Sequence, residues 1–241
     1  MVVIEQNRGQ VQPDHYDGFA QAYAEDNESS LFNAYYERPA MLELAGDVDG
    51  HRVLDAGCGS GLLASALRAK GARVTGFDAS PAMVDLARNR LGEGAAVHVA
   101  DLAERLPFDD AEFDDVVASL VLHYLPDWTG PLAEMRRVLR PGGRLLLSVN
   151  HPAIFKLANL DADYFALTEY SEEYTFNGER AVLTYWHRPL HAMTSSFTDA
   201  GFRISVIGEP PPAADTPPEL LADLNGRTRF LCFIFFVLEA V

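Results

Sequence analysis

The residues with the clearest chemical potential in this sequence are three glycines flanked by two acids. Residues 53–61 read VLDAGCGSG, which places glycine at 57, 59 and 61 shortly after Asp55, and Asp78 ends the next apolar run. A glycine cluster between a strand and a helix lets a ligand come very close to the main chain. A carboxylate at Asp55 would repel a pyrophosphate, so this position favours a ligand with a cationic group.

The neighbouring positions narrow the choice of ligand further. A dinucleotide-binding G-x-G-x-x-G pattern requires glycine where the chain has Leu62, and the G-K-[ST] of a phosphate-binding loop is absent. Asp78, at the end of the second apolar run, can accept hydrogen bonds from both hydroxyls of a ribose. Asp101, after the third run, can accept one from the exocyclic amine of adenine. Adenine, a free ribose diol and a cationic amino-acid tail together describe S-adenosylmethionine.

Four segments in order and register resemble the class I S-adenosylmethionine-dependent methyltransferases of the small-molecule, type 11-like kind. They are VLDAGCGSG, VTGFDAS, ADLAERLPF and FDDVVASLVLHYL, and the similarity covers roughly residues 30–150. The resemblance implies an α/β fold: a Rossmann-like, doubly wound sheet of seven mostly parallel strands with an antiparallel last strand. It implies S-adenosylmethionine as cofactor, S-adenosylhomocysteine as product, and an enzyme that methylates small molecules.

The resemblance also implies roles for individual residues. Asp55 and the main chain of the glycine loop would contact the methionine moiety, Asp78 the ribose, and Asp101 the adenine. The full set of cofactor-binding residues expected in the core is Asp55, Gly57, Cys58, Gly59, Gly61, Asp78, Ala79, Met83, Asp101, Leu102 and Ser119. Ser119 would act through its carbonyl, and Met83 would pack on the adenosine or simply in the core.

Three residues near the N-terminus are candidates for a lid over the cofactor. Tyr16 and Tyr23 are seven positions apart, which places them on one face of a helix. In relatives such tyrosines cover the cofactor, although two core aromatics would show the same spacing. Arg38 could pair with the cofactor carboxylate or remain solvated.

The acceptor side offers weaker candidates. Methyl transfer from a cationic donor mainly requires alignment of the nucleophile and exclusion of water, so a base matters only if the acceptor must lose a proton. His123 follows the fourth strand and is the candidate base, or else a histidine that orients the loop. The expected substrate-binding residues, from an aromatic-rich stretch and the end of the fifth strand, are His151, Tyr164, Tyr185 and His187. No acid cluster follows the fourth strand beyond Asp127, so we expect no metal.

The elements that position these residues alternate in type. Five apolar runs, most of them followed by a segment with helical periodicity, predict a parallel sheet covered on both faces. The runs are HRVLDAG, ARVTGFD, AVHVAD, FDDVVASLVLH and RLLLSVN, with helices expected at LLASALRAKG, PAMVDLARNRLG and LAEMRRVLRPGG. Alternating runs around Asn177-Gly178 predict a hairpin, and a helix at RPLHAMTSSFTDAGF precedes two last strands.

We therefore expect one methyltransferase domain over residues 1–241 with four parts. Residues 1–45 form a helical N-terminal lid, and residues 46–150 form the cofactor-binding core. Residues 151–188 form an insertion that caps the substrate, and residues 189–241 form the C-terminal helix and strands. The aromatic residues of the insertion suit a mid-sized, partly apolar acceptor.

Composition limits the possible partners. The net charge of -16 opposes binding to nucleic acid or to an anionic membrane, both of which need a basic surface. Two cysteines, no signal-peptide pattern and no apolar run long enough to span a bilayer favour a cytoplasmic protein. We expect a small-molecule substrate and a monomer or homodimer.

The sequence thus predicts a methyltransferase for a small organic acceptor, with a specialised metabolite of the antibiotic kind as one candidate. The aromatic insertion favours a nitrogen or carbon acceptor over oxygen. Two alternatives remain open: a module that binds S-adenosylmethionine without catalysis, and a nicotinamide-dependent oxidoreductase, which Leu62 and Asp55 oppose.

Overall fold

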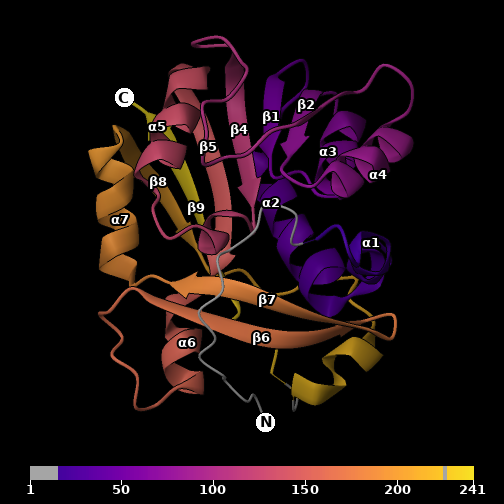
Figure 1. The fold of residues 1–241 in the computed structure, drawn as a ribbon, viewed down its shortest axis with the longest axis vertical. Helices are drawn as coiled ribbons and strands as arrows, with labels where there is room; N and C mark the ends of the chain where they lie inside the picture. The colour runs from indigo at the N-terminus through magenta and orange to yellow at the C-terminus, as the bar shows by residue number, and fades with distance from the viewer. Residues whose placement is uncertain (1–15, 225–226) are drawn as a thin grey trace.

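A computed structural model describes residues 16–224 and 227–241 and contains one large sheet (Figure 1). Seven strands lie in the order β3-β2-β1-β4-β5-β9-β8. All neighbouring pairs from β3 to β5 are parallel, while β9 runs antiparallel to both of its neighbours, β5 and β8. The predicted fold class, a doubly wound and mostly parallel sheet with an antiparallel last strand, is confirmed. The strands are β1 Arg52–Ala56, β2 Arg73–Asp78, β3 Ala96–Val99, β4 Phe113–Ser119, β5 Leu139–Asn150, β8 Phe202–Gly208 and β9 Phe233–Ala240.

Helices cover both faces of this sheet, which explains why its central strands are almost continuously apolar. On one face, α5 and α7 pack on a cluster that includes Trp128, Phe197 and Phe236. On the other face, α2 and α3 pack on a cluster that includes Tyr36, Met41 and Leu67. The helices of the core are α2 Arg38–Ala45, α3 Leu62–Ala69, α4 Pro81–Leu91, α5 Thr129–Val138 and α7 Leu190–Asp199.

Two boundaries differ from the sequence prediction. The fourth strand was expected to run to His123 but ends at Ser119, and a short 3-10 turn, η2 Leu122–Tyr124, follows it. The helix that Pro141 and Gly142 were expected to end already ends at Val138. Leu139 already pairs with Phe113, and the two strands shift register before Asp115. Gly143 is needed in this irregular stretch, because a Cβ there would lie 2.8 Å from the Asp114 carbonyl oxygen.

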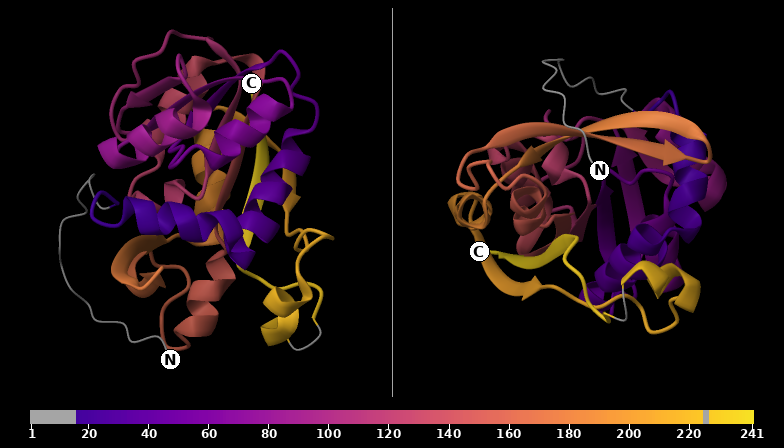
Figure 2. Two further views of the ribbon diagram at one scale, coloured as in Figure 1. Left: turned by 90° about the vertical axis from the view of Figure 1, so that its right-hand side faces the viewer. Right: turned by 90° about the horizontal axis from the view of Figure 1, so that it is seen from below.

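The segment between β5 and α7 forms a separate two-stranded sheet beyond the carboxyl ends of the parallel strands (Figures 1 and 2). It contains α6 Pro152–Ala158 and the strands β6 Thr168–Phe176 and β7 Glu179–His187. The predicted hairpin is confirmed, and both turn residues have positive φ, 47° at Asn177 and 88° at Gly178. Asn-Gly suits such a turn because each residue tolerates the left-handed conformation.

The N-terminal segment lies between the sheet and the hairpin (Figure 2). It consists of α1 Ala20–Ser29, a π-helical turn η1 Asn33–Glu37, and α2, which continues directly from it. Residues 1–15 of the expected lid lie outside the described residues. A further 3-10 segment, η3 Pro218–Leu224, precedes β9. Within the described residues, no helix combines the length and apolar character needed to cross a membrane.

Candidate functional site

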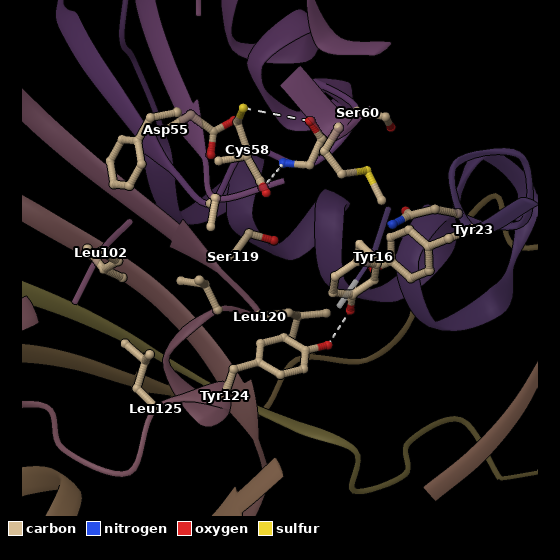
Figure 3. A pocket seen from close by; sticks show the side chains of 18 of the residues that line it. Tyr16, Tyr23, Asp55, Cys58, Ser60, Leu102, Ser119, Leu120, Tyr124 and Leu125 are labelled. Atoms are coloured by element: carbon tan, nitrogen blue, oxygen red, sulfur yellow. Dashed lines mark hydrogen bonds between the residues drawn. The ribbon is translucent and has the colours of Figure 1, made fainter. Parts of the chain in front are cut away.

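A cavity of about 1030 Å³ lies at the carboxyl ends of the parallel strands. The ends of β1, β2 and β4 bring Asp55, Asp78 and Ser119 to it, and the N-terminal segment and the hairpin complete its walls. Figure 3 shows Asp55, Cys58 and Ser119 on one side of this space and the aromatic rings of Tyr16 and Tyr124 on another. Open α/β sheets bind their ligands at this edge, so the cavity is the candidate site.

The glycine loop shapes the floor of the cavity. Gly57 and Gly59 have φ of 73° and 52°, a region that other residues rarely adopt. A Cβ on Gly57 would lie 2.7 Å from Cγ2 of Val121, whereas nothing lies within 4 Å of the position at Gly59. Both glycines line the cavity. The main chain at Gly59 therefore faces open space that a ligand can fill.

Gly61 has a different place from the one expected. It does not line the cavity but precedes α3 in a left-handed conformation, with φ of 79°. A Cβ there would lie 3.2 Å from Cα of Ala87 on α4. The third glycine of the motif thus permits close approach of two helices.

Asp78 ties the glycine loop to the end of β2. Its Oδ2 accepts a hydrogen bond from the N–H of Gly59, and its Oδ1 accepts one from the N–H of Ser80, both at 2.9 Å. Burial raises the pKa of this carboxyl group, and these main-chain hydrogen bonds partly oppose the rise. Asp78 lines the cavity, and each oxygen keeps a lone pair for a ligand hydroxyl.

Asp55 is a buried carboxylate without a partner. Its side chain is on the cavity wall, its exposure is 1%, and neither oxygen has a hydrogen-bond partner within the described residues. Burial raises the pKa of Asp55 to about 7, and the negative charges of Glu37 and Asp78 contribute to the rise. The N–H of Ala64 lies near enough to lower this pKa slightly, but it does not form a hydrogen bond with the carboxylate. Burying an unpaired carboxylate is costly. This arrangement fits a ligand that brings a cationic N–H group.

The expected adenosine contacts also lie on the cavity. Met83 and Leu102 are buried, and both line the cavity together with Ala79 and Asp101. Oδ1 of Asp101 accepts a hydrogen bond from the N–H of Ala103 at 2.8 Å, which fixes the carboxylate at the loop after β3. Apolar side chains beside a fixed carboxylate suit a flat ring with an exocyclic amine.

The N-terminal candidates Tyr16, Tyr23 and Arg38 line the cavity as well. Tyr16 lies in a turn before α1 rather than in the expected shared helix, yet its ring contacts that of Tyr23 edge-on at 4.9 Å. The hydroxyl groups of Tyr16 and Tyr124 are hydrogen-bonded, which joins the N-terminal segment to η2 (Figure 3). Arg38 donates to the carbonyl oxygen and to Oδ1 of Asn27.

Glu37 is a cavity residue that the sequence analysis missed. It lies at the end of η1 with an exposure of 3%. Its Oε1 accepts hydrogen bonds from Oγ of Ser119 at 2.7 Å and from Oγ of Ser148 at 2.6 Å. In YYERP it resembles any surface glutamate near a helix start, and no spacing in the sequence distinguishes it. Only the packing of η1 against the ends of β4 and β5 places it inside.

His123 does not reach the cavity wall. It is buried, its Nδ1 accepts a hydrogen bond from the N–H of Asn150 at 3.1 Å, and its ring contacts those of Tyr124 and Tyr185. Burial lowers its pKa to about 3, so the ring is neutral at physiological pH. This geometry is that of a histidine that fixes the loop after β4 to the end of β5.

The four expected substrate-binding residues also lie away from the cavity. His151 caps α6 by accepting from the N–H of Ala153, and its Nε2 contacts Glu209. His187 stacks on Phe155, and its Nε2 is 2.8 Å from the carbonyl oxygen of Tyr164. Tyr185 points to the opposite face of the hairpin, where aromatic rings pack together.

The other face of the hairpin forms a wall of the cavity. We call it the hairpin wall; it consists of Glu169, Ser171, Val182, Thr184 and Trp186. Strand alternation explains why Tyr185 and His187 miss the cavity while Trp186 lines it: Tyr170 pairs with Tyr185 on one face, and Glu169 pairs with Trp186 on the other. The indole Nε1 of Trp186 is buried without a hydrogen-bond partner in the described part of the chain.

Comparison with known proteins agrees with this geometry. Residues 54–147 match the family model described as a methyltransferase domain. A malonyl-[acyl-carrier protein] O-methyltransferase of Serratia marcescens is 39% identical over 108 residues, 45% of this chain and 42% of its own. A ubiquinone biosynthesis O-methyltransferase of Xanthomonas euvesicatoria is 41% identical over 133 residues, 52% of this chain and 53% of its own. The chain thus spans about half the length of these curated relatives.

Solved structures resemble the chain over a greater length. An S-adenosylmethionine-dependent methyltransferase from Mesorhizobium loti is 25% identical, with a TM-score of 0.63 and coverage of 83% of this chain and 96% of that one. A 1,6-didemethyltoxoflavin-N1-methyltransferase from Burkholderia thailandensis is 20% identical, with a TM-score of 0.59 and coverage of 100% and 96%. The latter structure holds its substrate and S-adenosylhomocysteine.

Proposed function

We propose that this chain, whose residues 54–147 belong to the methyltransferase domain family and whose fold is that of class I S-adenosylmethionine-dependent methyltransferases, methylates a small organic acceptor. The observation that carries the proposal is the buried carboxylate of Asp55, which has no hydrogen-bond partner among the described residues and lies beside the open glycine loop. When bound there, S-adenosylmethionine would supply a methyl group bonded to a sulfonium. The sulfonium becomes a neutral thioether when it loses the methyl group, and this makes it a good leaving group. The chain's own residues bind this cofactor, orient the acceptor and exclude water.

The cofactor would lie along the strand ends in an order set by the acids. Asp55 and the main chain of Gly57, Cys58 and Gly59 hold the methionine portion. Asp78 accepts from the ribose hydroxyls with the lone pairs that its loop contacts leave free. The adenine end is held by a carboxylate and apolar side chains, which are Ala79, Met83, Asp101 and Leu102. Ser119 contributes its carbonyl oxygen beside the methionine portion.

The N-terminal segment would act as the lid. Tyr16 and Tyr23 stand over the cavity, and the hydroxyl contact of Tyr16 with Tyr124 holds the segment closed. Closure excludes water from the reacting atoms, which keeps the acceptor as the available nucleophile. Arg38, fixed by Asn27, lies on the same wall and can face the carboxylate of the cofactor.

The acceptor would lie against the hairpin wall, so we propose residues 151–188 as the substrate cap. Trp186 offers an indole N–H that no described residue accepts from, and Glu169, its cross-strand partner, offers a carboxylate. This pair suits an acceptor that carries a hydrogen-bond acceptor and a donor on one edge. The positions of His151, Tyr164, Tyr185 and His187 favour supporting roles behind the wall, and that of His123 favours a positioning role.

The acceptor atom is not fixed by this geometry. The two curated relatives are named O-methyltransferases, and the Burkholderia neighbour is named an N1-methyltransferase. The sequence-based preference for nitrogen or carbon therefore has no support from the curated relatives, nor has a role in specialised metabolism. We propose to test hydroxylated aromatic acceptors first and nitrogen heterocycles second.

Calorimetric titration with S-adenosylmethionine, S-adenosylhomocysteine and NAD tests the cofactor assignment. The wild type should bind the first two and not NAD. Asp78→Ala should weaken both by at least tenfold, since it removes the ribose contact and frees the loop. Asp85→Ala, which changes a solvent-exposed acid on α4, should bind as the wild type does. Binding of NAD alone would show that the glycine loop has been misinterpreted.

Transfer of a labelled methyl group from S-adenosylmethionine to a panel of phenols, catechols and nitrogen heterocycles tests catalysis. Turnover on any of them would establish the enzyme. Cofactor binding without turnover across the panel would favour a module that binds the cofactor without catalysis.

A further inference from the structure

Glu37 and Asp55 are two buried carboxylates that line the same cavity, and we call them the carboxylate pair. They come from different parts of the fold: Glu37 ends the π-helical turn of the lid, and Asp55 lies in β1. Both line the cavity, with exposures of 3% and 1%. The charge of Glu37 contributes to the raised pKa of Asp55, after burial as the main cause.

The carboxylate of Glu37 is held in a defined position. Two hydroxyl groups, from Ser119 at the end of β4 and Ser148 on β5, donate to the same oxygen, Oε1. Burial raises the pKa of Glu37, and these two hydrogen bonds oppose the rise. With Oε1 saturated in this way, Oε2 is the oxygen that can meet a ligand.

Within the described residues, no cation forms an ion pair with the carboxylate pair, and the one cationic charge that lowers the pKa of Glu37 is that of Arg38. Among the ion pairs of the described residues, none involves Glu37 or Asp55. Arg38, the next residue in the chain, directs its guanidinium group to Asn27 instead. Burying two acids that no cation of the described residues contacts is costly, and a ligand cation would offset that cost.

We propose that Glu37 is a cofactor-binding residue, and that the carboxylate pair holds the ammonium group of the amino-acid portion of the cofactor. This inference rests on the proposed function. The ammonium group suits the pair better than the sulfonium does, because it has three N–H donors for carboxylate oxygens and the sulfonium has none. The hydroxyl of Ser119 donates to Glu37, and its carbonyl oxygen is expected beside the methionine portion of the cofactor. Glu37 is therefore expected at the same end of the cofactor as Asp55.

Glu37 is part of the N-terminal segment, which its hydrogen bonds to Ser119 and Ser148 already join to the sheet. An ammonium group between Glu37 and Asp55 would add a further contact between the segment and β1. A ligand with the adenosine portion but no amino-acid portion would miss this contact. 5′-Deoxy-5′-methylthioadenosine is such a ligand, and S-adenosylhomocysteine carries the same adenosine with the ammonium group attached.

Calorimetric titration of both ligands into the wild type and Glu37→Gln tests the proposal. The amide keeps the size of the side chain and removes its charge. We expect S-adenosylhomocysteine to bind about 10- to 100-fold more weakly to Glu37→Gln, the range for a hydrogen bond to a charged group, and methylthioadenosine to change less than twofold. Glu43→Gln, an exposed acid on α2 in the same segment, should leave both affinities unchanged.

Other changes in the affinities of Glu37→Gln for the two ligands would contradict the proposal. Equal weakening of both ligands would make Glu37 a support of the lid and overturn the proposal, as would unchanged binding of both. If the wild type bound neither ligand, the proposed function itself would fail. Should Glu37→Gln not fold, Ser148→Ala takes its place, because it removes one of the two hydroxyl groups that hold Glu37 and lies outside the cavity. It should weaken S-adenosylhomocysteine more than methylthioadenosine, and equal changes for the two ligands would overturn the proposal.

Discussion

The buried carboxylate of Asp55, which we propose to bind the cofactor, lowers the stability of the ligand-free fold when it is ionised. Its carboxyl group has a pKa near 3.8 in the unfolded chain and about 7 in the folded, ligand-free protein, chiefly because of burial. The folded state therefore binds more protons than the unfolded state between these two values. By linkage, the free energy of unfolding falls as the pH rises through this window, and the loss is complete above the folded pKa.

Asp55→Asn should consequently be more stable than the wild type at pH 8, with a difference that shrinks at pH 5 and vanishes below pH 4. The gain is at most about 4 kcal/mol, because one pH unit of pKa displacement corresponds to about 1.4 kcal/mol. Urea unfolding at the three pH values measures it, with Asp85→Asn as the exposed control. A less stable Asp55→Asn at pH 8 would mean that the ionised carboxylate has a stabilising partner in solution.

At Gly57, the methyl group of an alanine side chain would displace Val121 on the cavity wall. Gly57→Ala should lower the free energy of unfolding by roughly 1–3 kcal/mol, from backbone strain at φ of 73°. It should also weaken S-adenosylhomocysteine at least tenfold, because Val121, which the new Cβ displaces, lines the cavity. Unfolding and calorimetry measure the two effects.

Gly92→Ala is the matched control for Gly57→Ala. Gly92 has φ of 85° and nothing within 4 Å of a new Cβ, and it lies outside the cavity. It should lose stability from strain alone and bind the ligand normally. Equal binding losses in both variants would indicate that the weakening reflects general loosening of the fold.

At the scale of elements, the hairpin separates packing from recognition by strand alternation. Trp186 lies on the hairpin wall, and its neighbour Tyr185 lies on the packed face. Trp186→Phe should raise the KM for the acceptor found in the methyl-transfer screen about 5- to 10-fold, since it removes one hydrogen-bond donor. It should leave the affinity for S-adenosylhomocysteine unchanged.

Tyr185→Phe is the control from the opposite face. It removes a hydroxyl that contacts Tyr174, so stability should fall slightly and the KM should stay as in the wild type. Steady-state kinetics of both variants with the same acceptor make the comparison. A larger KM effect at Tyr185 than at Trp186 would reverse the assignment of the two faces.

The presence of the helices and strands was easier to predict from the sequence than the residues at which they end. The runs that became β1, β2 and β3 stand between clear turn residues, and Asn177-Gly178 marked the hairpin turn correctly. The end of β4 was wrong because Leu120, Val121 and Leu122 continue the apolar run into a 3-10 turn. Hydrophobicity alone does not separate a buried strand from the buried loop that follows it.

On the scale of the whole molecule, the domain match and the seven-stranded sheet confirm the resemblance to class I S-adenosylmethionine-dependent methyltransferases. Ligand binding should then stabilise the whole fold by mass action. At a concentration of S-adenosylhomocysteine 100 times its Kd, the gain is about 2.7 kcal/mol. For a chain of this length the Tm should rise by roughly 5–10 °C.

Thermal unfolding followed by circular dichroism measures this shift. NAD at the same concentration is the control and should leave the Tm unchanged. A rise with NAD, or none with S-adenosylhomocysteine at concentrations that saturate in calorimetry, would contradict a single site built into the folded sheet.

The sequence by itself determined the sheet, the glycine loop and the acids that follow its strands. These features are local: a turn that only glycine tolerates, or an acid directly after an apolar run, is visible in a few consecutive residues. Tertiary structure alone decided that Glu37 is inside the cavity, that His123 is behind it, and that the hairpin presents Trp186 rather than Tyr185. Those outcomes depend on which face of a strand or turn meets a distant segment, and one sequence does not encode that choice in any short pattern.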